Sequence, residues 1–120
     1  MSRNAKEMTK KIVAALDEKK AEEIRIIDIS EVSIMADYFV IAHGNNRNQV
    51  QALIDNVEEK LSKEDGIMPK QTEGYRNANW VLMDYGDVIV HVFDKENRLF
   101  YDLERIWKDG KNVEADEFRD

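Results

Sequence analysis

Residues 80–93 constrain the fold most strongly, because they predict a β-hairpin that is buried on both of its faces. Two runs rich in valine, isoleucine and aromatic residues flank an Asp-Tyr-Gly-Asp break, in which Gly86 can adopt the positive φ that tight turns require. A strand exposed on one face alternates apolar and polar residues, but residues 88–93 contain only one polar side chain, His91. We therefore expect the hairpin at the centre of a sheet, with Asp84 and Asp87 at the turn where it meets solvent.

The composition indicates one domain with a heavily charged exterior. Of the 120 residues, 42% are hydrophobic and 36% are charged, which is typical of a compact globular domain. The formal net charge is −7. Repulsion from phosphate then disfavours a broad grip on nucleic acid, so we expect a basic protein surface as the partner, with limited or no direct nucleic-acid contact.

The residue types that are missing narrow the chemistry. The sequence has no cysteine, which excludes disulfides and thiolate chemistry. No apolar run approaches the about 18 residues of a membrane-spanning helix, and no secretory signal is present, so we expect a cytoplasmic protein without a membrane partner. His43 and His91 are the only histidines. Because no cysteine can assist them, we expect no closed zinc site and no cofactor.

Apolar spacing predicts two long helices in the first half of the chain. The first spans about residues 5–19 and begins with a reciprocal cap between Asn4 and Glu7. The second begins after Asn46 and Gln49, which can cap its start, and ends at Gly66. Its apolar stripe consists of Val50, Leu53, Ile54, Val57 and Leu61.

Short β-branched and aromatic runs predict the remaining strands. Residues 24–29 and 37–44 have this composition, and Pro69 restricts any strand in residues 67–73 to the edge of a sheet, because proline lacks a backbone donor. Together with the hairpin, these elements predict a single-domain α/β fold: a mixed sheet of about five strands with flanking helices. The strand order stays open at this point.

After the hairpin, the sequence predicts one more helix and then a tail. The residues at helical spacing are Leu99, Leu103, Ile106 and Trp107, and Gly110 can end the helix. Glu104 lies one turn before Lys108, where the two can form an ion pair. Residues 111–120 contain four acidic residues and little to bury. We therefore expect residues 1–110 to form the domain and residues 111–120 a flexible acidic tail.

Several motifs, in this order and spacing, resemble those of one known family. They are Asp37-Tyr38-Phe39-Val40-Ile41 with Gly44, Gln49-Val50-Gln51-Ala52, Glu73-Gly74, Trp80-Val81-Leu82 with Asp84, residues 86–93, and Tyr101 with Leu103-Glu104 and Trp107. Over about residues 5–109 the chain is similar to the ribosomal silencing factors (RsfS), also called the Iojap-like family. It departs from the family at Tyr85, where many members have leucine. It also departs at Asn45-Asn46, although asparagine can still cap the start of the following helix.

The resemblance implies a protein that is not an enzyme and that binds the large ribosomal subunit. Family members dock on its fourteenth ribosomal protein and block joining of the small subunit, which represses translation when nutrients are scarce. The implied fold has a nucleotidyltransferase-like core without the catalytic motif, and members are often homodimers. Relatives in organelles act in ribosome assembly, so a role as a large-subunit assembly factor is an alternative.

Six residues are candidates for partner binding: Trp80, Asp84, Asp87, His91, Tyr101 and Glu104. A large amphipathic aromatic such as Trp80 can anchor an interface, although it can equally lie at the rim of the core. The two aspartates can offer an acidic edge or simply accept backbone hydrogen bonds in the turn. His91 can be a hydrogen-bonded histidine of the sheet rather than a binding residue.

Two other classes of function need consideration. Nucleotidyl transfer requires carboxylates that converge on a divalent metal, usually after a Gly-Ser turn that holds phosphates. Here Gly44 is followed by Asn45 and no acidic pair follows on a strand, so we expect no catalytic residues. A pure oligomerisation module, which buries a sheet edge against a second copy, is the third possibility.

Overall fold

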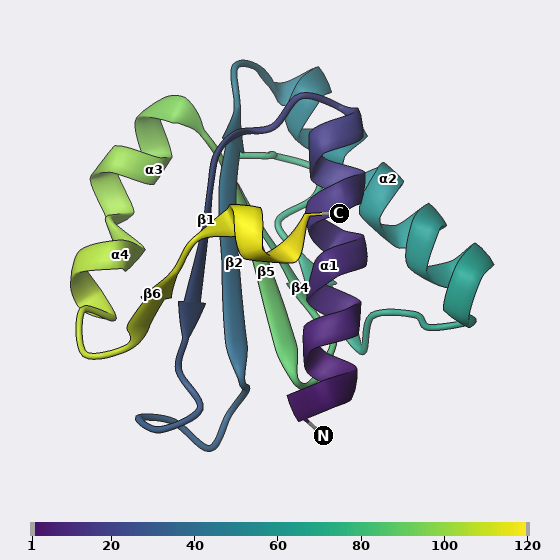
Figure 1. Cartoon of the computed structure of the whole chain (residues 1–120). Coiled ribbons are helices and arrows are strands. Elements are labelled where there is room, and N and C mark those ends of the chain that lie inside the picture. Colours follow the sequence, from purple (N-terminus) through teal and green to yellow (C-terminus); the bar gives the residue numbers. More distant parts are fainter. Residues whose placement is uncertain (1, 120) are drawn as a thin grey trace.

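The chain folds into one six-stranded mixed sheet with helices on both faces (Figure 1). The computed structural model describes residues 2–119, with side chains from Asn4 onward. The elements are α1 (Ser2–Glu18), β1 (Glu22–Asp28), β2 (Tyr38–Gly44), α2 (Arg47–Asp65), β3 (Gln71–Glu73), β4 (Trp80–Asp84), β5 (Val88–Asp94), α3 (Lys95–Tyr101), α4 (Leu103–Ile106), β6 (Lys111–Val113) and the 3-10 helix η1 (Ala115–Phe118). The α/β class is confirmed, with six strands rather than about five.

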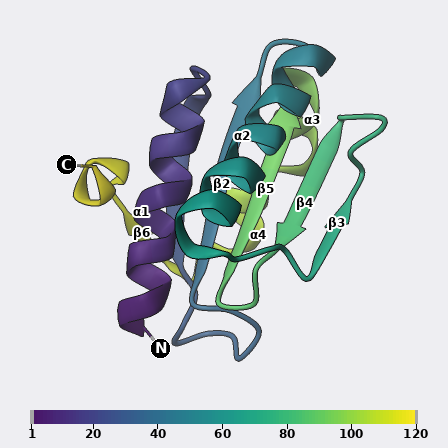
Figure 2. The same ribbon diagram turned by 90° about the vertical axis from the view of Figure 1, so that its right-hand side faces the viewer.

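The sheet has the strand order β3-β4-β5-β2-β1-β6. The β2 and β5 strands pair in parallel, and every other neighbouring pair is antiparallel. Helices α1 and α2 cover one face, while α3 and α4 lie on the other (Figure 2). The Pro69 segment leads into β3, which is an edge strand as predicted.

The predicted hairpin is confirmed as β4 and β5. Trp80 pairs with Phe93 and Asp84 with Ile89, and Gly86 has a φ of 90° in the turn between them. All side chains from Val88 to Phe93 are buried. Because β5 lies between β4 and β2, and helices cover both faces of the sheet, the near-absence of polar residues follows from its position.

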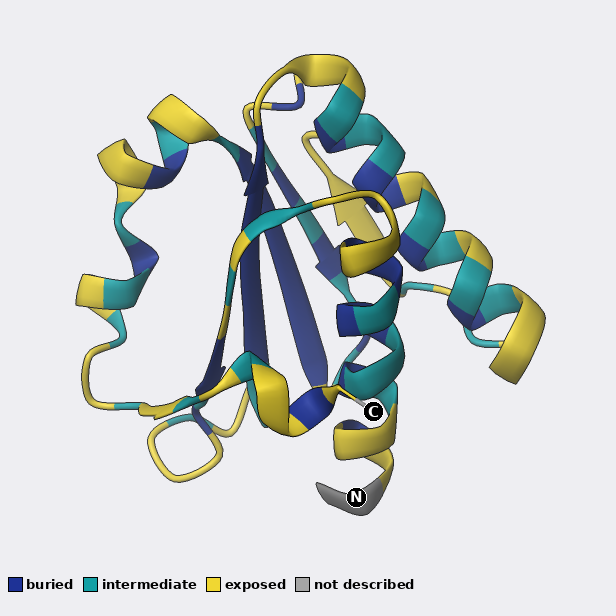
Figure 3. Cartoon of the chain, turned by 45° about the horizontal axis from the view of Figure 1, so that its top comes forward, coloured by how far each residue is buried: buried dark blue, intermediate teal, exposed yellow. Residues whose placement is uncertain are grey.

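Two apolar cores lie on opposite faces of the sheet (Figure 3). The α1–α2 face contains Val40, Val81, Met83, Val88, Val90 and Val92, packed against residues of the two long helices. The α3–α4 face contains Ile27, Ile29, Phe39, Ile41, Ile89, Phe93 and Leu103. This division follows the alternation of side chains along each strand.

Helix α2 begins and ends as the sequence predicts. The Asn46 side chain accepts a hydrogen bond of 2.8 Å from the backbone N–H of Gln49. At the other end Gly66 has a φ of 66°, and its N–H donates to the carbonyl of Ser62. These contacts satisfy backbone groups that a helix otherwise leaves unpaired.

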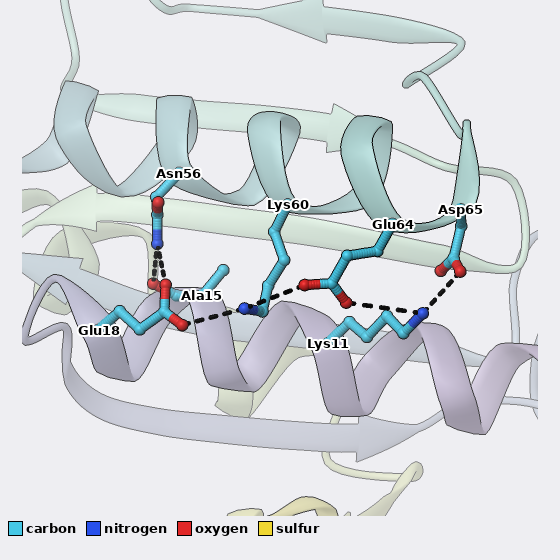
Figure 4. A network of polar contacts seen from close by, with 7 residues as sticks. All are labelled: Lys11, Ala15, Glu18, Asn56, Lys60, Glu64 and Asp65. Atoms are coloured by element: carbon cyan, nitrogen blue, oxygen red, sulfur yellow. Dashed lines mark hydrogen bonds and ion pairs between the residues drawn. The ribbon is translucent and has the colours of Figure 1, made fainter.

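A chain of polar contacts joins α1 to α2 (Figure 4). Lys60 Nζ lies 2.9 Å from Glu18 and 3.4 Å from Glu64. Lys11 Nζ lies 2.6 Å from Asp65, and the side chain of Asn56 donates to the carbonyl of Ala15 at 2.8 Å. The charged residues of this face are thus largely engaged with one another.

Local predictions for two segments, the start of α1 and the helix after residue 93, were wrong. Helix α1 starts at Ser2, so Asn4 lies inside the helix and is not its cap. The single helix expected after residue 93 is instead two short helices, because Asp102 takes a left-handed conformation with φ 48° and ψ 57°. Glu104 pairs with Arg98 rather than Lys108, and α4 ends at Ile106, before Gly110.

Residues 111–119 form β6 and η1 and pack against the rest of the fold, where the sequence predicted a loose tail. Strand β6 pairs with β1, and Phe118 is only 3% exposed, with its ring against Tyr38 at 5.6 Å. Arg119 donates to both carboxylate oxygens of Asp17 at 2.8 and 3.0 Å. The acidic composition predicted a tail, but two apolar residues of this segment, Val113 and Phe118, pack against the core. Asp120 lies outside the described residues.

Tyr85 provides a test of the packing beneath the hairpin turn. Its side chain is 6% exposed, and its hydroxyl has no hydrogen-bond partner among the described residues. Burial raises the pKa of this phenol above its ordinary value. Because an unpaired buried hydroxyl costs about 1–3 kcal/mol, Tyr85→Phe should raise the free energy of unfolding by about 1 kcal/mol, as measured by urea denaturation. Tyr75→Phe is the control, since that exposed hydroxyl donates to Asp55 at 2.9 Å and its loss should stabilise nothing. Equal or lower stability of Tyr85→Phe would contradict the prediction.

Candidate partner-docking surface

Trp80 and His91 form a hydrogen-bonded pair on the α3–α4 face of the sheet. Trp80 Nε1 donates to His91 Nδ1 at 3.0 Å. An indole N–H can only donate, so Nδ1 is an acceptor and the neutral ring of His91 carries its proton on Nε2. The indole also stacks on Phe93, with ring centroids 5.2 Å apart. The orientation of Trp80 is therefore set by the sheet.

His91 is held in this neutral state by its surroundings. His91 is 4% exposed. The Phe39 ring packs edge-on against the imidazole, with ring centroids 4.7 Å apart. Burial lowers the pKa of His91 to about 4, because the charged imidazolium loses its hydration. His91 is thus a hydrogen-bonded histidine of the sheet that holds Trp80, and its role in partner binding stays a prediction.

Helices α3 and α4 expose four large apolar side chains, which we call the α3–α4 apolar surface: Leu99, Phe100, Tyr101 and Ile106. Their exposed fractions are 76%, 79%, 39% and 64%. The Tyr101 ring also packs against Trp80, with ring centroids 4.6 Å apart. This contact joins the α3–α4 apolar surface to the half-buried Trp80. Large apolar side chains that two neighbouring helices leave exposed favour an interaction site.

The sequence pattern predicted Leu99 and Ile106 as members of one helix, and Phe100 was not among the candidate partner-binding residues. A signal was present, however. Residues 99–101 are three consecutive large apolar side chains, and three consecutive positions of a helix point in different directions. They cannot all pack against the sheet.

The six predicted partner-binding residues do not form one compact site. Trp80 and Tyr101 lie together, with His91 beneath Trp80. Asp84 shares the face of Trp80 but lies four residues further along β4, about 13 Å away at the usual rise of a strand. There its carboxylate accepts the N–H of Gly86 at 2.8 Å, which is the turn role considered above.

Asp87 lies apart from that cluster, and Glu104 is paired within the protein. Asp87 is exposed in the hairpin turn, and its backbone carbonyl accepts N–H groups from Asp37 and Tyr38 at 2.7 and 3.2 Å. The Glu104 carboxylate is 2.8 Å from Arg98 Nη2. The structure therefore gives an apolar surface beside Trp80 and a separate acidic turn.

Neither a metal centre nor an obvious substrate pocket emerges from the described residues. Within residues 4–119, no three histidine or acidic side chains gather as metal ligands would. A small cavity of about 210 Å³ lies between His43, Arg98 and Leu99, and an open hollow of about 630 Å³ is lined by the ion-paired residues of α1 and α2. Across the described part of the chain, none of the helices has both the length and the apolar character needed to cross a membrane.

Comparison with known proteins identifies the family. The family model described as "Ribosomal silencing factor during starvation" matches residues 2–120. The chain belongs to the ribosomal silencing factor family. The ribosomal silencing factor RsfS of Bacillus subtilis is 44% identical over 113 residues, which cover 94% of this chain and 95% of that protein.

Other members of the family agree in sequence and in fold. RsfS of Halalkalibacterium halodurans is 44% identical over 110 residues, 92% of this chain and 93% of that protein. A crystal structure of a Chromobacterium violaceum protein superposes with a TM-score of 0.81 at 36% identity, covering 85% of this chain and 84% of that one. The family is confirmed, and its description names a role in silencing ribosomes, which is not an enzyme class.

The neutral state of His91 predicts a pH dependence of stability. In the unfolded chain a histidine has a pKa near 6.5, whereas burial lowers the folded-state pKa to about 4. The unfolded chain therefore binds the proton more readily. The stabilisation from the neutral ring is fully present above pH 6.5 and is lost as the pH falls towards 4, by up to about 3 kcal/mol.

Urea denaturation at pH 7 and pH 4.5 measures this loss. His91→Gln is the matched variant, because an amide oxygen can still accept from Trp80 but does not titrate in this range. Carboxylates titrate in both proteins, so the informative quantity is the difference between them, and wild type should lose more stability at pH 4.5. The same loss in both proteins would show that His91 is not responsible.

Proposed function

We propose that this protein represses translation by binding the large ribosomal subunit through its fourteenth ribosomal protein, which blocks joining of the small subunit when nutrients are limited. Membership of the ribosomal silencing factor family supports a role at the ribosome. The observation that carries the proposal is the α3–α4 apolar surface, which lies beside the fixed ring of Trp80. In this mechanism the bound protein acts by steric exclusion and needs no catalytic group.

The chemistry of the surface suits a protein partner. Exposed aromatic and aliphatic side chains supply the contacts that dominate protein–protein binding, and Trp80 and Tyr101 are residue types enriched at such contacts. A net charge of −7 favours a basic partner and makes extensive contact with nucleic acid unfavourable. A second copy of the chain could cover the same apolar surface, so we propose that a homodimer and the ribosome-bound form compete for it.

Phe100→Ser tests the docking surface. The side chain is 79% exposed, so its loss should leave the melting temperature unchanged. If it inserts into a pocket of the partner, the loss should cost about 2 kcal/mol of binding, or roughly thirtyfold in Kd. Co-sedimentation with salt-washed large subunits measures binding, and addition of small subunits shows whether joining is still blocked.

Met68→Ser is the matched control for Phe100→Ser. Met68 is also apolar and is 55% exposed, but it lies beside acidic residues of α2, away from α3 and α4. It should bind like wild type. If Phe100→Ser also binds and blocks joining like wild type, the α3–α4 apolar surface is not the docking site.

Asp87→Lys tests the contribution of the acidic turn. Because Asp87 is exposed and only its backbone carbonyl holds neighbouring residues, the fold should be retained. Reversing the charge should slow association with a basic partner at low salt, and the difference should shrink as salt is added. Glu114→Lys, which makes the same charge change at an exposed position near the C-terminus, is the control. Equal association rates for the two variants would show that the position of Asp87 does not matter.

A further inference from the structure

Arg98 is the one arginine of the described chain that is buried, with 7% of its surface exposed. A charged side chain rarely occupies such a position unless it is fully paired. Its Nη2 donates to Glu104 Oε2 at 2.8 Å, and its Nη1 donates to His43 Nδ1 at 3.0 Å and to the carbonyl of Glu22 at 3.3 Å. Both terminal nitrogens of the planar guanidinium therefore donate hydrogen bonds.

His43 is an internal partner of this guanidinium. Only 3% of its side chain is exposed. Because arginine can only donate, Nδ1 of His43 is an acceptor and the neutral ring carries its proton on Nε2. Nε2 lies 3.3 Å from a carboxylate oxygen of Glu22, outside hydrogen-bond geometry. His43 and Glu22 thus hold Arg98 from the sheet side.

These contacts connect four elements near Asp102, where α3 ends and α4 begins. Arg98 belongs to α3 and Glu104 to α4, while His43 lies on β2 and Glu22 on β1. The two helices are separated only by Asp102, whose left-handed conformation stops one helix before the next begins. An isolated helix of four to seven residues has little stability of its own. Tertiary contacts must therefore fix the angle between α3 and α4.

We propose that Arg98 is a positioning residue for the docking surface, and that Glu104 acts through Arg98 rather than by touching the partner. Leu99, Phe100 and Tyr101 are carried by α3 and Ile106 by α4, so the Arg98–Glu104 contact sets how these side chains are presented together. The inference rests on the proposed function, since it deepens the role of the same surface. It also gives Glu104 a different role from the partner contact expected from sequence.

A double-mutant cycle on the full-length protein tests this inference, with binding to salt-washed large subunits as the measurement. Arg98→Met removes the guanidinium and retains an unbranched stem, and should weaken binding about tenfold. Glu104→Gln should weaken it less. If the two residues act through one contact, the double variant binds no more weakly than Arg98→Met alone. A further loss in the double variant, equal to the effect of Glu104→Gln alone, would mean that Glu104 meets the partner directly and would overturn the proposal.

Hydrogen exchange on the free protein supplies a second measurement that needs no ribosome. Amides of residues 95–107 should exchange about tenfold faster in Arg98→Met than in wild type, with the amides of β2, β4 and β5 unchanged. If Arg98→Met does not fold, Arg98→Lys takes its place, because lysine lacks the fork that reaches Glu104 and His43 together. Unchanged exchange, or faster exchange with unchanged binding, would overturn the positioning role.

Lys60→Met is the matched control. Lys60 is 19% exposed at its side chain and joins α2 to α1 through Glu18, on the opposite face of the sheet from Arg98; it also pairs with Glu64 of its own helix. Its loss should leave both ribosome binding and exchange of residues 95–107 unchanged. If the wild-type protein does not bind large subunits, the proposed function is overturned, and with it the role of the Arg98–Glu104 contact in binding. Hydrogen exchange still tests whether that contact positions α3 and α4, because it needs no ribosome.

Discussion

The burial of β5 on both faces is the constraint on which the rest of the structure depends. Its position between β2 and β4 leaves every side chain of Val88–Phe93 buried. The two long helices cover Val88, Val90 and Val92, but Ile89, His91 and Phe93 face the other way and need a cover of their own. That cover is provided by α3 and α4, which are short and broken. The apolar surface that they expose is thus a consequence of how little chain is available to protect the second face.

The parts of the fold that the sequence predicted depend on local signals. The hairpin, the capped helix α2 and the edge position after Pro69 each follow from residues that are close together in the chain. Trp80 was recognised as a candidate for the docking surface by its residue type, and Tyr101 was carried over from the family resemblance. Their contact could not be foreseen, because it joins the beginning of β4 to the end of α3.

What the sequence did not predict depends on contacts between distant residues. The break at Asp102 has no glycine or proline to indicate it, and two of the partners of Arg98, His43 and Glu22, lie 55 and 76 residues away in the chain. The C-terminal residues are mostly polar and charged, which does not predict burial. Nevertheless the ring of Phe118 packs against Tyr38, and Arg119 donates a hydrogen bond to Asp17. Helical spacing predicted one continuous helix through Leu99, Leu103, Ile106 and Trp107, which Asp102 divides into two.

The placement of the tryptophans has a practical consequence. The chain contains only two, Trp80 and Trp107, and both are packed on the side of the sheet that carries α3 and α4. Their indoles contact His91 and Phe39 respectively, whereas the opposite side contains none. Ultraviolet emission from the unmodified protein is therefore an intrinsic optical reporter of one side of the molecule, so that docking there can be followed without any attached dye.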